Sequence, residues 1–404
     1  MRTKILFLWE AIVAFLIIGV LIGCSKDSGN GSDSLSNEEL QARLQANLTN
    51  MVATAHSIHN AVLLVEAPQR NFKWVGAAGM ADSAAGLVMN PADQFRTASI
   101  GKMTCAALTL KMAEAGYFTL DDSIYHYLPD SIMTGLHILG GQDYSNRITI
   151  RHLLSHRSGL ADYVQDGDVN GNGLPDFLEL LISQPQKFWT PQETIEYTKQ
   201  NLTPLFIPGE GFHYSDTNYQ LLGLLLQQIT SSTLHALYRE RLFTPLGMNY
   251  TYLEFYDNPI PSVPGHGLSQ VFFGEIDYTH WTSASADWAG GGLVSTAEDL
   301  NRFLRAFVNN QIFQNSQSKT EMLNWQPTGE SGIYYGLGTI RFNLDELGFS
   351  GFGEIYGHEG FPQSFMYYWP PQNVTLAGTL NQASSEEVYH LQVIMGIISL
   401  LREE

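Results

Sequence analysis

A serine stands three residues before a lysine in the stretch FRTASIGKM, where a polar segment gives way to a long apolar run. Residues three apart share one face of a helix, so this spacing brings the hydroxyl of Ser99 within reach of the amine of Lys102. A serine hydroxyl attacks a carbonyl carbon when a neighbouring base takes its proton, and lysine serves as that base if burial lowers its pKa. The free N–H groups of a helix start also stabilise an oxyanion. We therefore predict that Ser99 is a nucleophile and Lys102 its base.

A second serine and lysine with the same spacing lie at Ser316 and Lys319, in a polar stretch with no apolar helix behind them. Spacing alone does not choose between the two pairs, but the apolar helix that follows Ser99 does. A thiol nucleophile at Cys105 is the other option, yet its neighbours in MTCAALTLKMAEAG are apolar, which indicates a small buried residue.

Two further motifs are predicted to be structural. His152 and His156 have the i, i+4 spacing of zinc ligands but lack the glutamate of an HExxH site. The glycine-rich stretch WAGGGL lacks the Lys-Ser/Thr ending of a phosphate-binding loop.

The elements that must position these residues follow a simple order. A helix over residues 38–51 leads into two strand-like runs, AVLLVE and FKWVGAAGM, and residues 100–305 form a predominantly helical middle. After Tyr334 strands return, and an apolar-periodic helix over residues 386–401 closes the chain. Strands at both ends around a helical middle predict an α/β fold, with one sheet built from both ends of the chain.

Composition limits the class of protein. The chain has 404 residues, of which 44% are hydrophobic, enough for a sizeable buried core. Its formal net charge of −19 argues against a nucleic-acid partner, because no basic block is present to neutralise phosphates.

Several segments follow one another in an order that resembles the penicillin-recognising serine hydrolases. They are FRTASIGKMTCAALTLKMAEAGYFTLDDSIYHYLP, ITIRHLLSHRSGL, PGEGFHYSDTNYQLLGLLL, LFTPLGM and WAGGGLVSTAEDLNRFLRAF. Within that superfamily the likeness is to the branch of class C β-lactamases, D-alanyl-D-alanine carboxypeptidases and related esterases. The resemblance implies a β-lactamase/transpeptidase-like fold, an antiparallel sheet flanked by helices with an inserted all-α region. It also implies an active site between these parts that requires no cofactor.

The Tyr-x-Asn element of this superfamily falls on Tyr214, Ser215 and Asp216. The resemblance makes Tyr214 a second proton-transfer group, which accepts a proton from Ser99 and delivers it to the leaving group. Asp216 stands where the family pattern has an asparagine that contacts substrate. A carboxylate at this position is expected to favour the charged form of Lys102 and to repel a substrate carbonyl oxygen.

The third element, Lys-Thr-Gly or His-x-Gly on an edge strand, falls on His358, Glu359 and Gly360. The resemblance implies that His358 is a further catalytic residue and that Glu359 and Gly360 bind substrate. A glycine there lets the substrate backbone lie close against the strand. The resemblance further implies an oxyanion hole formed by the backbone N–H groups of Ser99 and Phe361. Glu359 replaces a threonine that often helps to bind a substrate carboxylate, so weaker recognition of β-lactams and D-Ala-D-Ala termini is expected.

The stretch DVNGNGLPDFLE matches the formula of an EF-hand-type calcium loop. A polar surface loop is the alternative, because Asp, Asn and Gly are common in turns. The terminal glutamate at the required spacing favours calcium, in a structural role. The predicted ligands are Asp168, Asn170, Asn172, the backbone carbonyl of Leu174, Asp176 and Glu179.

The N-terminus has the pattern expected of a targeting signal. Arg2 and Lys4 precede an apolar run over residues 11–22 that ends in LIGC, which resembles the lipobox of bacterial lipoproteins. An uncleaved transmembrane helix is disfavoured, because a span needs about 20 apolar residues. We therefore expect an exported protein, anchored to a bacterial membrane in the cell envelope. The predicted organisation is a signal peptide at residues 1–23, a lipidated Cys24 with a flexible tether over residues 24–36, and a serine hydrolase domain over residues 37–404.

The expected activity is hydrolysis of an amide or ester through an acyl-enzyme. The expected substrate is a D-amino-acid peptide, as in a DD-carboxypeptidase or D-aminopeptidase, or a β-lactam. Two alternatives stay open, an esterase of small esters and a catalytically weak envelope binding or scaffolding protein. Asp216 and Glu359 are the departures that keep the last alternative open.

Overall fold

The computed structural model describes residues 35–383 and 389–402. The predicted signal peptide, Cys24 and all but the last two residues of the predicted tether lie outside the described residues. Within the described part of the chain, no helix combines the length and apolar character needed to cross a membrane.

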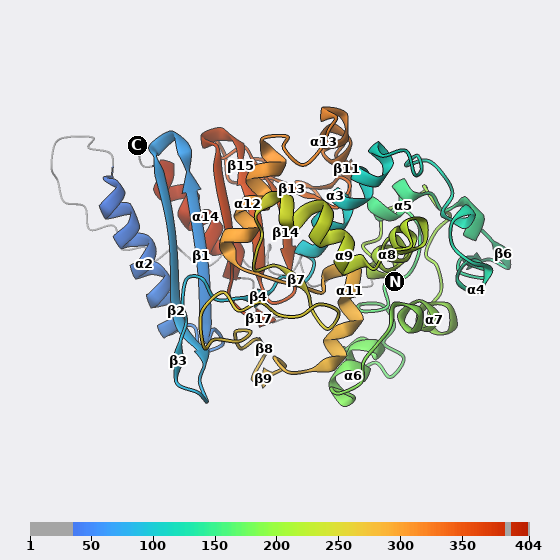
Figure 1. Cartoon of the computed structure of the whole chain (residues 1–404), viewed down its shortest axis with the longest axis horizontal. Helices are drawn as coiled ribbons and strands as arrows, with labels where there is room; N and C mark the ends of the chain where they lie inside the picture. Colours follow the sequence, from blue (N-terminus) through green and yellow to red (C-terminus); the bar gives the residue numbers. More distant parts are fainter. Residues whose placement is uncertain (1–34, 384–388, 403–404) are drawn as a thin grey trace.

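A nine-stranded antiparallel sheet forms the centre of the fold (Figure 1). In spatial order its strands are β11 (Gln326–Pro327), β12 (Ile333–Tyr335), β13 (Ile340–Asn343), β14 (Glu354–Gly360), β15 (Ser364–Trp369), β16 (Val374–Thr379), β1 (Asn60–Ala67), β2 (Phe72–Asp82) and β3 (Leu87–Val88). Strand β1 pairs with β2 on one side and with β16 on the other. The two ends of the chain therefore share one sheet, as the order of elements predicts.

Both faces of this sheet are covered, so its strands are apolar on both sides. Along β1, Val62 and Leu64 belong to the core under the helical middle of the chain. Leu63 and Val65 belong to the core under the terminal helices. This alternation follows from the two-residue period of a strand.

Helices α2 (Asn37–Thr54) and α14 (Tyr389–Arg402) cover one face (Figure 1). A capping box starts α2, because the Ser36 hydroxyl accepts from the N–H of Glu39 and the Glu39 carboxylate accepts from the N–H of Ser36. Its residues at a spacing of four turn toward the sheet, and they are Leu40, Leu44 and Leu48.

Helices α3 (Ile100–Glu114) and α12 (Ala297–Val308) pack on the other face of the sheet. Beyond them lies a helical region (Figure 1) that contains α5 (Ile150–Leu154), α6 (Asp176–Ser183), α7 (Pro191–Asn201), α8 (Asp216–Thr230) and α11 (Trp288–Gly291). Helix α3 is buried nearly all round, as expected of a helix that is apolar on every side. It passes between the sheet and α8, so the serine at its start lies where the two parts of the fold meet.

The thiol of Cys105 lies inside α3 and is fully buried. Burial raises its pKa to about 12, so the thiolate is absent at neutral pH. The prediction of a small buried residue is confirmed.

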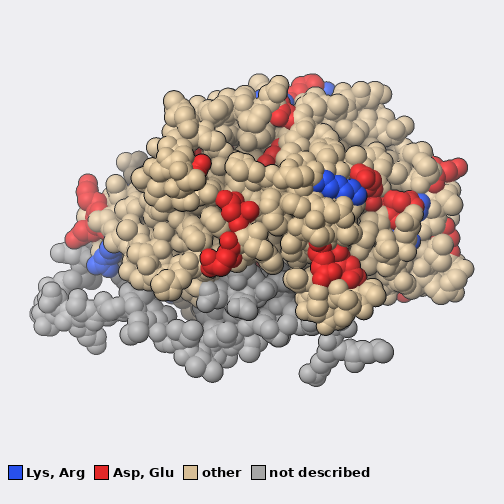
Figure 2. All heavy atoms as spheres, turned by 90° about the horizontal axis from the view of Figure 1, so that it is seen from below, with Lys and Arg blue, Asp and Glu red and all other residues tan. Residues whose placement is uncertain are grey.

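Acidic side chains are more common than basic ones on one face of the molecule (Figure 2). On the face in Figure 2, acidic side chains are spread over several areas and basic ones are few. This agrees with the net charge of −19.

Candidate active site

The predicted nucleophile and its lysine lie together at the start of α3. Ser99 is the N-cap residue, and Lys102 sits one turn later with its Nζ atom 2.9 Å from Ser99 Oγ. Ser99 remains partly exposed, whereas Lys102 is fully buried. The preceding residue, Ala98, has a φ of 44°, a left-handed conformation that is strained for alanine and shapes the entry into the helix.

The second serine–lysine pair is not assembled in this way. The amine of Lys319 donates to the carbonyl of Val308 and lies over the ring of Phe307. Context thus selects Ser99, and the geometry agrees with that choice.

The lysine is held by an acidic environment. Lys102 Nζ donates to Ser99 Oγ, to Asp216 Oδ1 and to the Gly290 carbonyl, the last at 3.1 Å. Burial alone would lower the pKa of Lys102, but the carboxylates of Asp216 and Asp287 outweigh it and raise the pKa above its ordinary value. The expectation of a lysine base with a lowered pKa is therefore wrong. The expectation that Asp216 favours the charged amine is confirmed.

Tyr214 completes the group around the serine hydroxyl. Lys102 Nζ lies 4.9 Å from the centre of its ring, in a cation–π contact. Burial raises the pKa of the Tyr214 phenol well above its usual value and Asp216 adds to this, while a hydrogen bond with Ser99 opposes it. The phenol therefore keeps its proton at neutral pH.

Three carboxylates gather around this one ammonium group. Asp216 opens α8, and its backbone N–H donates to Asp162 Oδ1 at 3.2 Å. Burial raises the pKa of Asp162 well above its usual value, with Asp216 as the next cause. Burial, followed by the nearby Asp216, likewise raises the pKa of Asp287 to about 7. Sequence reasoning missed Asp162 and Asp287, which lie outside the matched elements.

The short helix α11 brings Asp287 to the site. Trp288, its first residue, has a φ of 27°, a strained value that turns the chain sharply. The helix then packs so closely on α3 that a Cβ on Gly101 would lie 2.9 Å from the Cα of Gly291. Likewise, a Cβ on Gly291 would lie 2.5 Å from both Asp287 Oδ2 and the carbonyl carbon of Ala98. The glycines of WAGGGL are thus required for a backbone contact.

A buried row of hydrogen-bonded side chains, His156, Tyr335 and His358, packs against Tyr214. The His156 ring stacks on Tyr214 with centroids 4.3 Å apart, and its Nδ1 accepts from the N–H of Ser215 at 3.0 Å. Its Nε2 lies 3.2 Å from the Tyr335 hydroxyl, which lies 3.2 Å from His358 Nε2. His156 is thus a structural residue, as predicted, and it positions Tyr214. Tyr335 carried no sequence signal.

The third element lies at the end of β14. His358 is 1% exposed, and burial, reinforced by the charge of Lys102, lowers its pKa to about 3, so its ring is neutral. The edge strand was predicted wrongly, because β14 lies between β13 and β15. However, pairing with β13 ends at Gly357, which leaves residues 358–360 without a partner strand on that side.

Glu359 points away from the nucleophile, because successive side chains of a strand face opposite sides. Its Oε2 accepts from the Tyr367 hydroxyl at 2.7 Å and lies 2.9 Å from Nε2 of His390 on α14. Burial would raise the pKa of Glu359, but His390 and these hydrogen bonds lower it. The prediction that the Glu359 side chain binds substrate is therefore wrong.

Gly360 and Phe361 lie close to the serine. A Cβ on Gly360 would lie 2.2 Å from the carbonyl oxygen of Thr97, so a larger residue does not fit. The Ser364 hydroxyl donates to the same carbonyl at 2.6 Å and ties the β14–β15 turn to the segment before α3. This brings the Phe361 segment next to Ser99. The Phe361 side chain is 45% exposed and stacks on Phe273.

The predicted calcium loop is a turn that leads into α6. Gly173 has a φ of 90°, and the amides of Asn170 and Asn172 donate to the carboxylate of Glu179. The side chains of Asp168 and Asp176 accept from backbone N–H groups within the loop. In residues 35–383 and 389–402, no group of three or more His, Cys, Asp or Glu side chains is placed to hold a metal ion.

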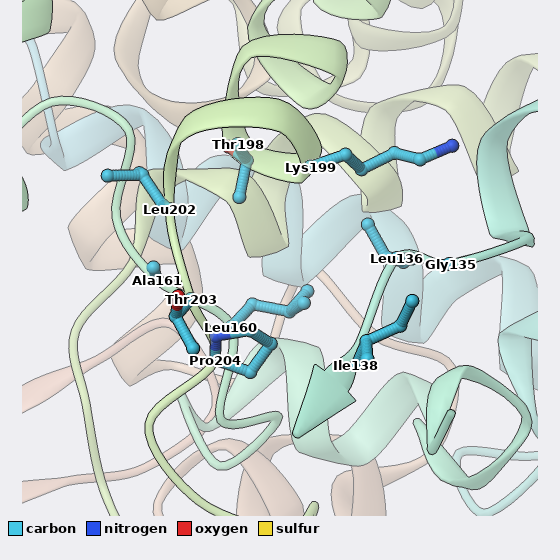
Figure 3. A pocket seen from close by; sticks show the side chains of 10 residues that line it. All are labelled: Gly135, Leu136, Ile138, Leu160, Ala161, Thr198, Lys199, Leu202, Thr203 and Pro204. Atoms are coloured by element: carbon cyan, nitrogen blue, oxygen red, sulfur yellow. The ribbon is translucent and has the colours of Figure 1, made fainter. Parts of the chain in front are cut away.

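A separate small pocket lies among the helices (Figure 3), and no predicted catalytic residue lines it. The amine of Lys199 at its rim donates to the Ser131 carbonyl. The lining residues are Gly135, Leu136, Ile138, Leu160, Ala161, Thr198, Lys199, Leu202, Thr203 and Pro204.

Comparison with known proteins places this geometry in a family. The model of the family described as Beta-lactamase matches residues 45–394. The chain belongs to the beta-lactamase family. The resemblance inferred from the ordered segments and the expected β-lactamase/transpeptidase-like fold are both confirmed.

Among relatives of this beta-lactamase-family protein, the penicillin-binding protein 4* of Bacillus subtilis is 25% identical over 284 residues, 66% of this chain and 55% of that one. The chain thus spans about half of that relative's length. Esterase EstB of Burkholderia gladioli is 25% identical over 325 residues, 70% of this chain and 78% of the esterase. A crystal structure of D-amino acid amidase from Ochrobactrum anthropi SV3 with D-phenylalanine shares the fold, with a TM-score of 0.72, 23% identity and coverage of 90% and 98%.

Proposed function

We propose that the protein is a serine hydrolase that cleaves an amide or ester through an acyl-enzyme on Ser99. The observation that carries this proposal is the 2.9 Å contact between Lys102 Nζ and Ser99 Oγ beneath the ring of Tyr214. A scaffolding protein would have no need of a buried lysine aimed at a partly exposed hydroxyl. The assembled group therefore favours an enzyme.

Both Lys102 and Tyr214 hold their protons in the resting site, which favours a relay over a free base. Ser99 Oγ bonds to the substrate carbonyl carbon while its proton passes to the phenol oxygen of Tyr214. The phenol proton passes in turn to the leaving nitrogen or oxygen as the bond to carbon breaks. The Lys102 ammonium stabilises the negative charge that develops on both oxygens. Water then releases the acyl group by the reverse relay.

The end of β14 that has no partner strand on the β13 side supplies the residues for the other roles in the reaction. The backbone N–H groups of Ser99 and Phe361 form the oxyanion hole, and Gly360 allows the substrate backbone to lie along the strand. His358, neutral and hydrogen-bonded to Tyr335, supports the Tyr214 side of the site. Asp216 does not contact the substrate in this scheme. It keeps Lys102 in the charged form, and the ammonium group of Lys102 acts on the reacting atoms.

The proposed substrates are D-amino-acid peptides or related amides, with β-lactams as a second class. The resemblance to penicillin-recognising serine hydrolases supports this choice. An esterase is the alternative, supported by the similarity to EstB over 70% of the chain.

A fluorophosphonate probe tests the nucleophile directly. We expect mass spectrometry to find the adduct on Ser99, and Ser99→Ala to abolish labelling and hydrolysis. Ser316→Ala is the matched control, because it removes the serine of the other pair and should label normally. An adduct on Ser316, or none on the folded protein, would refute the proposal.

We also propose that the protein is exported and lipid-anchored through Cys24, on the strength of the LIGC segment. Cells fed labelled palmitate should label the Cys105→Ala variant but not Cys24→Ala. The chain contains 2 cysteines, so the two variants form a complete pair. Equal labelling of both would contradict the anchor.

A structural calcium ion in the loop from Asp168 to Glu179 is a further part of this proposal. It is supported by the match to the loop formula and by the convergence of Asn170 and Asn172 on Glu179. Millimolar calcium should raise the melting temperature, and Glu179→Gln should remove the increase. The control variant Glu196→Gln changes an exposed acidic residue of α7, and it should retain the increase in melting temperature. A melting temperature indifferent to calcium and chelator would exclude the site.

A further inference from the structure

The charges around Ser99 do not balance. The carboxylates of Asp162, Asp216 and Asp287 surround the ammonium of Lys102, and Asp216 already pairs with it. Besides Lys102, the cation that acts on Asp287 is Arg96. Ionised, the three acids would leave a surplus of negative charge in a largely buried place, which is unfavourable without a further cation or a bound proton.

Neither Arg96 nor the nearby histidines remove this surplus. Arg96 is held in a bidentate pair by Glu254 and donates also to the carbonyls of Tyr278 and Thr279. Its charge is thus taken up by Glu254. His156 and His358 are neutral, because burial lowers the pKa of each below its ordinary range.

A second, independent observation is an unsatisfied atom. Asp162 is fully buried, and its Oδ1 accepts from the N–H groups of Val164 and Asp216. Its Oδ2 is buried and has no hydrogen-bond partner. A buried polar atom without a partner is unfavourable and uncommon, so the cluster is incomplete as it stands.

Asp287 is the member of the cluster that a ligand can reach. It is partly exposed, whereas Asp162 and Asp216 are buried. A Cβ built on Gly290 would lie 3.6 Å from Asp287 Oδ1 and 3.7 Å from Lys102 Nζ, so the carboxylate and the ammonium flank the same glycine. A Cβ built on Gly291 would lie 2.5 Å from Asp287 Oδ2 and also 2.5 Å from the carbonyl carbon of Ala98. Ala98 is the residue before the nucleophile. Asp287 Oδ2 thus lies beside the backbone that leads directly into the nucleophile.

We propose that Asp287 binds a protonated amino group of the substrate, so that the enzyme prefers amides or esters of amino acids with a free α-amino group. An α-amino nitrogen is two bonds from the carbonyl carbon that Ser99 attacks, which suits an anchor this close to the nucleophile. The substrate ammonium supplies a cation next to Asp287, and the nearby carboxylate of Asp216 reinforces the attraction. This inference rests on the proposed hydrolase function and narrows it to an aminopeptidase or amidase.

The carboxylates near Ser99 disfavour substrates that carry a carboxylate of their own. A substrate carboxylate, as in a β-lactam or a C-terminal D-Ala-D-Ala, would add a further anion beside the surplus. The Glu359 side chain, on the opposite face of the sheet, offers no contact that would compensate. A carboxypeptidase or β-lactamase activity is therefore disfavoured.

The test compares matched substrates that differ in one charge. D- and L-phenylalanine p-nitroanilide and their N-acetyl forms are assayed, and the better enantiomer is used. For the natural protein we expect kcat/KM for the free amine to exceed that for the N-acetyl form by about tenfold or more, as one charge-assisted hydrogen bond would give. Asp287→Asn should lower this ratio by about tenfold. Asp121→Asn, which removes an exposed acid paired with Arg151, should keep the ratio.

Two outcomes would overturn the inference. One is a natural protein that prefers the N-acetyl substrate or a carboxylate-bearing one, and the other is an Asp287→Asn variant whose ratio is unchanged. If every anilide is cleaved too slowly to measure, a second assay replaces the kinetics. It measures how well an added amide slows the labelling of Ser99 by the fluorophosphonate. Phenylalanine amide should protect and N-acetylphenylalanine amide should not, while equal protection would overturn the inference. Labelling of Ser99 in these cases shows that the hydrolase proposal survives, whereas a folded protein that resists labelling removes both.

Discussion

Replacing Asp287 by asparagine should stabilise the fold, and the effect should depend on pH. The pKa of this carboxyl is raised from 3.8 to about 7, chiefly because burial disfavours the anion and next because Asp216 is close. Each unit of pKa corresponds to about 1.4 kcal/mol, so ionised Asp287 destabilises the folded state by up to about 4 kcal/mol. Because the side chain is partly exposed, solvent screening reduces this to about 2–3 kcal/mol.

The sign follows from proton linkage. Below the ordinary pKa of 3.8, both the folded and the unfolded chain carry a protonated Asp287, so the carboxyl imposes no electrostatic penalty. As pH rises to about 7, the unfolded chain loses this proton first and the natural protein loses stability. The Asp287→Asn variant has no such group. Its advantage should therefore be small at pH 4 and fully developed at pH 8.

Thermal unfolding of the two proteins at both pH values measures this difference. At pH 8 the melting temperature of Asp287→Asn should exceed that of the natural protein by roughly 5 °C, and at pH 4 by much less. A variant that is less stable at pH 8, or equally shifted at both pH values, would refute the account of the buried charge. Combined with the expected loss of amine selectivity, the gain would show that the natural residue is kept for function at the expense of stability.

The remaining predictions concern the reaction. Tyr214→Phe should lower kcat by about 10²–10⁴ in single-turnover assays, since it removes the relay oxygen; a loss below threefold would exclude the relay. Asp216→Asn should raise hydrolysis of a β-lactam relative to p-nitrophenyl acetate, because it removes an anion that repels substrate carboxylate and carbonyl oxygens; an unchanged ratio would contradict this. For free-amine substrates, kcat/KM should rise toward about pH 7 as Asp287 ionises, and it should fall at higher pH as the substrate amine loses its proton. The N-acetyl substrates should lack this rise, and identical pH profiles for both would argue against Asp287 as the anchor.

The sequence by itself determined the elements that depend on local order and periodicity. The spacing of Ser99 and Lys102 places them on one helical turn whatever surrounds that turn, and their atoms lie 2.9 Å apart. Thr190 and Glu193 have the spacing of a capping box, another local pattern, and the box is present at the start of α7. Ser295 and Glu298 have the same spacing, but α12 is capped by Thr296. Strands at both ends of the chain sufficed to predict one shared sheet.

Tertiary structure decided the balance of charges at the site, beyond the effect of Asp216 on Lys102 that the family pattern already predicted. Asp162, Asp216 and Asp287 are far apart in the chain, and α8 and α11 bring them to Lys102. Asp162 and Asp287 are single acidic residues in an acidic sequence, and nothing in the sequence shows that they lie near Lys102. The predicted sign of the pKa shift of Lys102 was therefore wrong, since it depended on partners and not on burial alone.

The direction of Glu359 was decided in the same way. The family pattern placed it on the right strand, but the pleat turns its carboxylate toward Tyr367 and His390 on the far side of the sheet. Its partner on α14 lies 31 residues further along the chain, and that helix packs on one particular face. Local sequence specifies which residues share a turn or a strand, whereas the charges that set their pKa values come from segments that meet only in the folded chain.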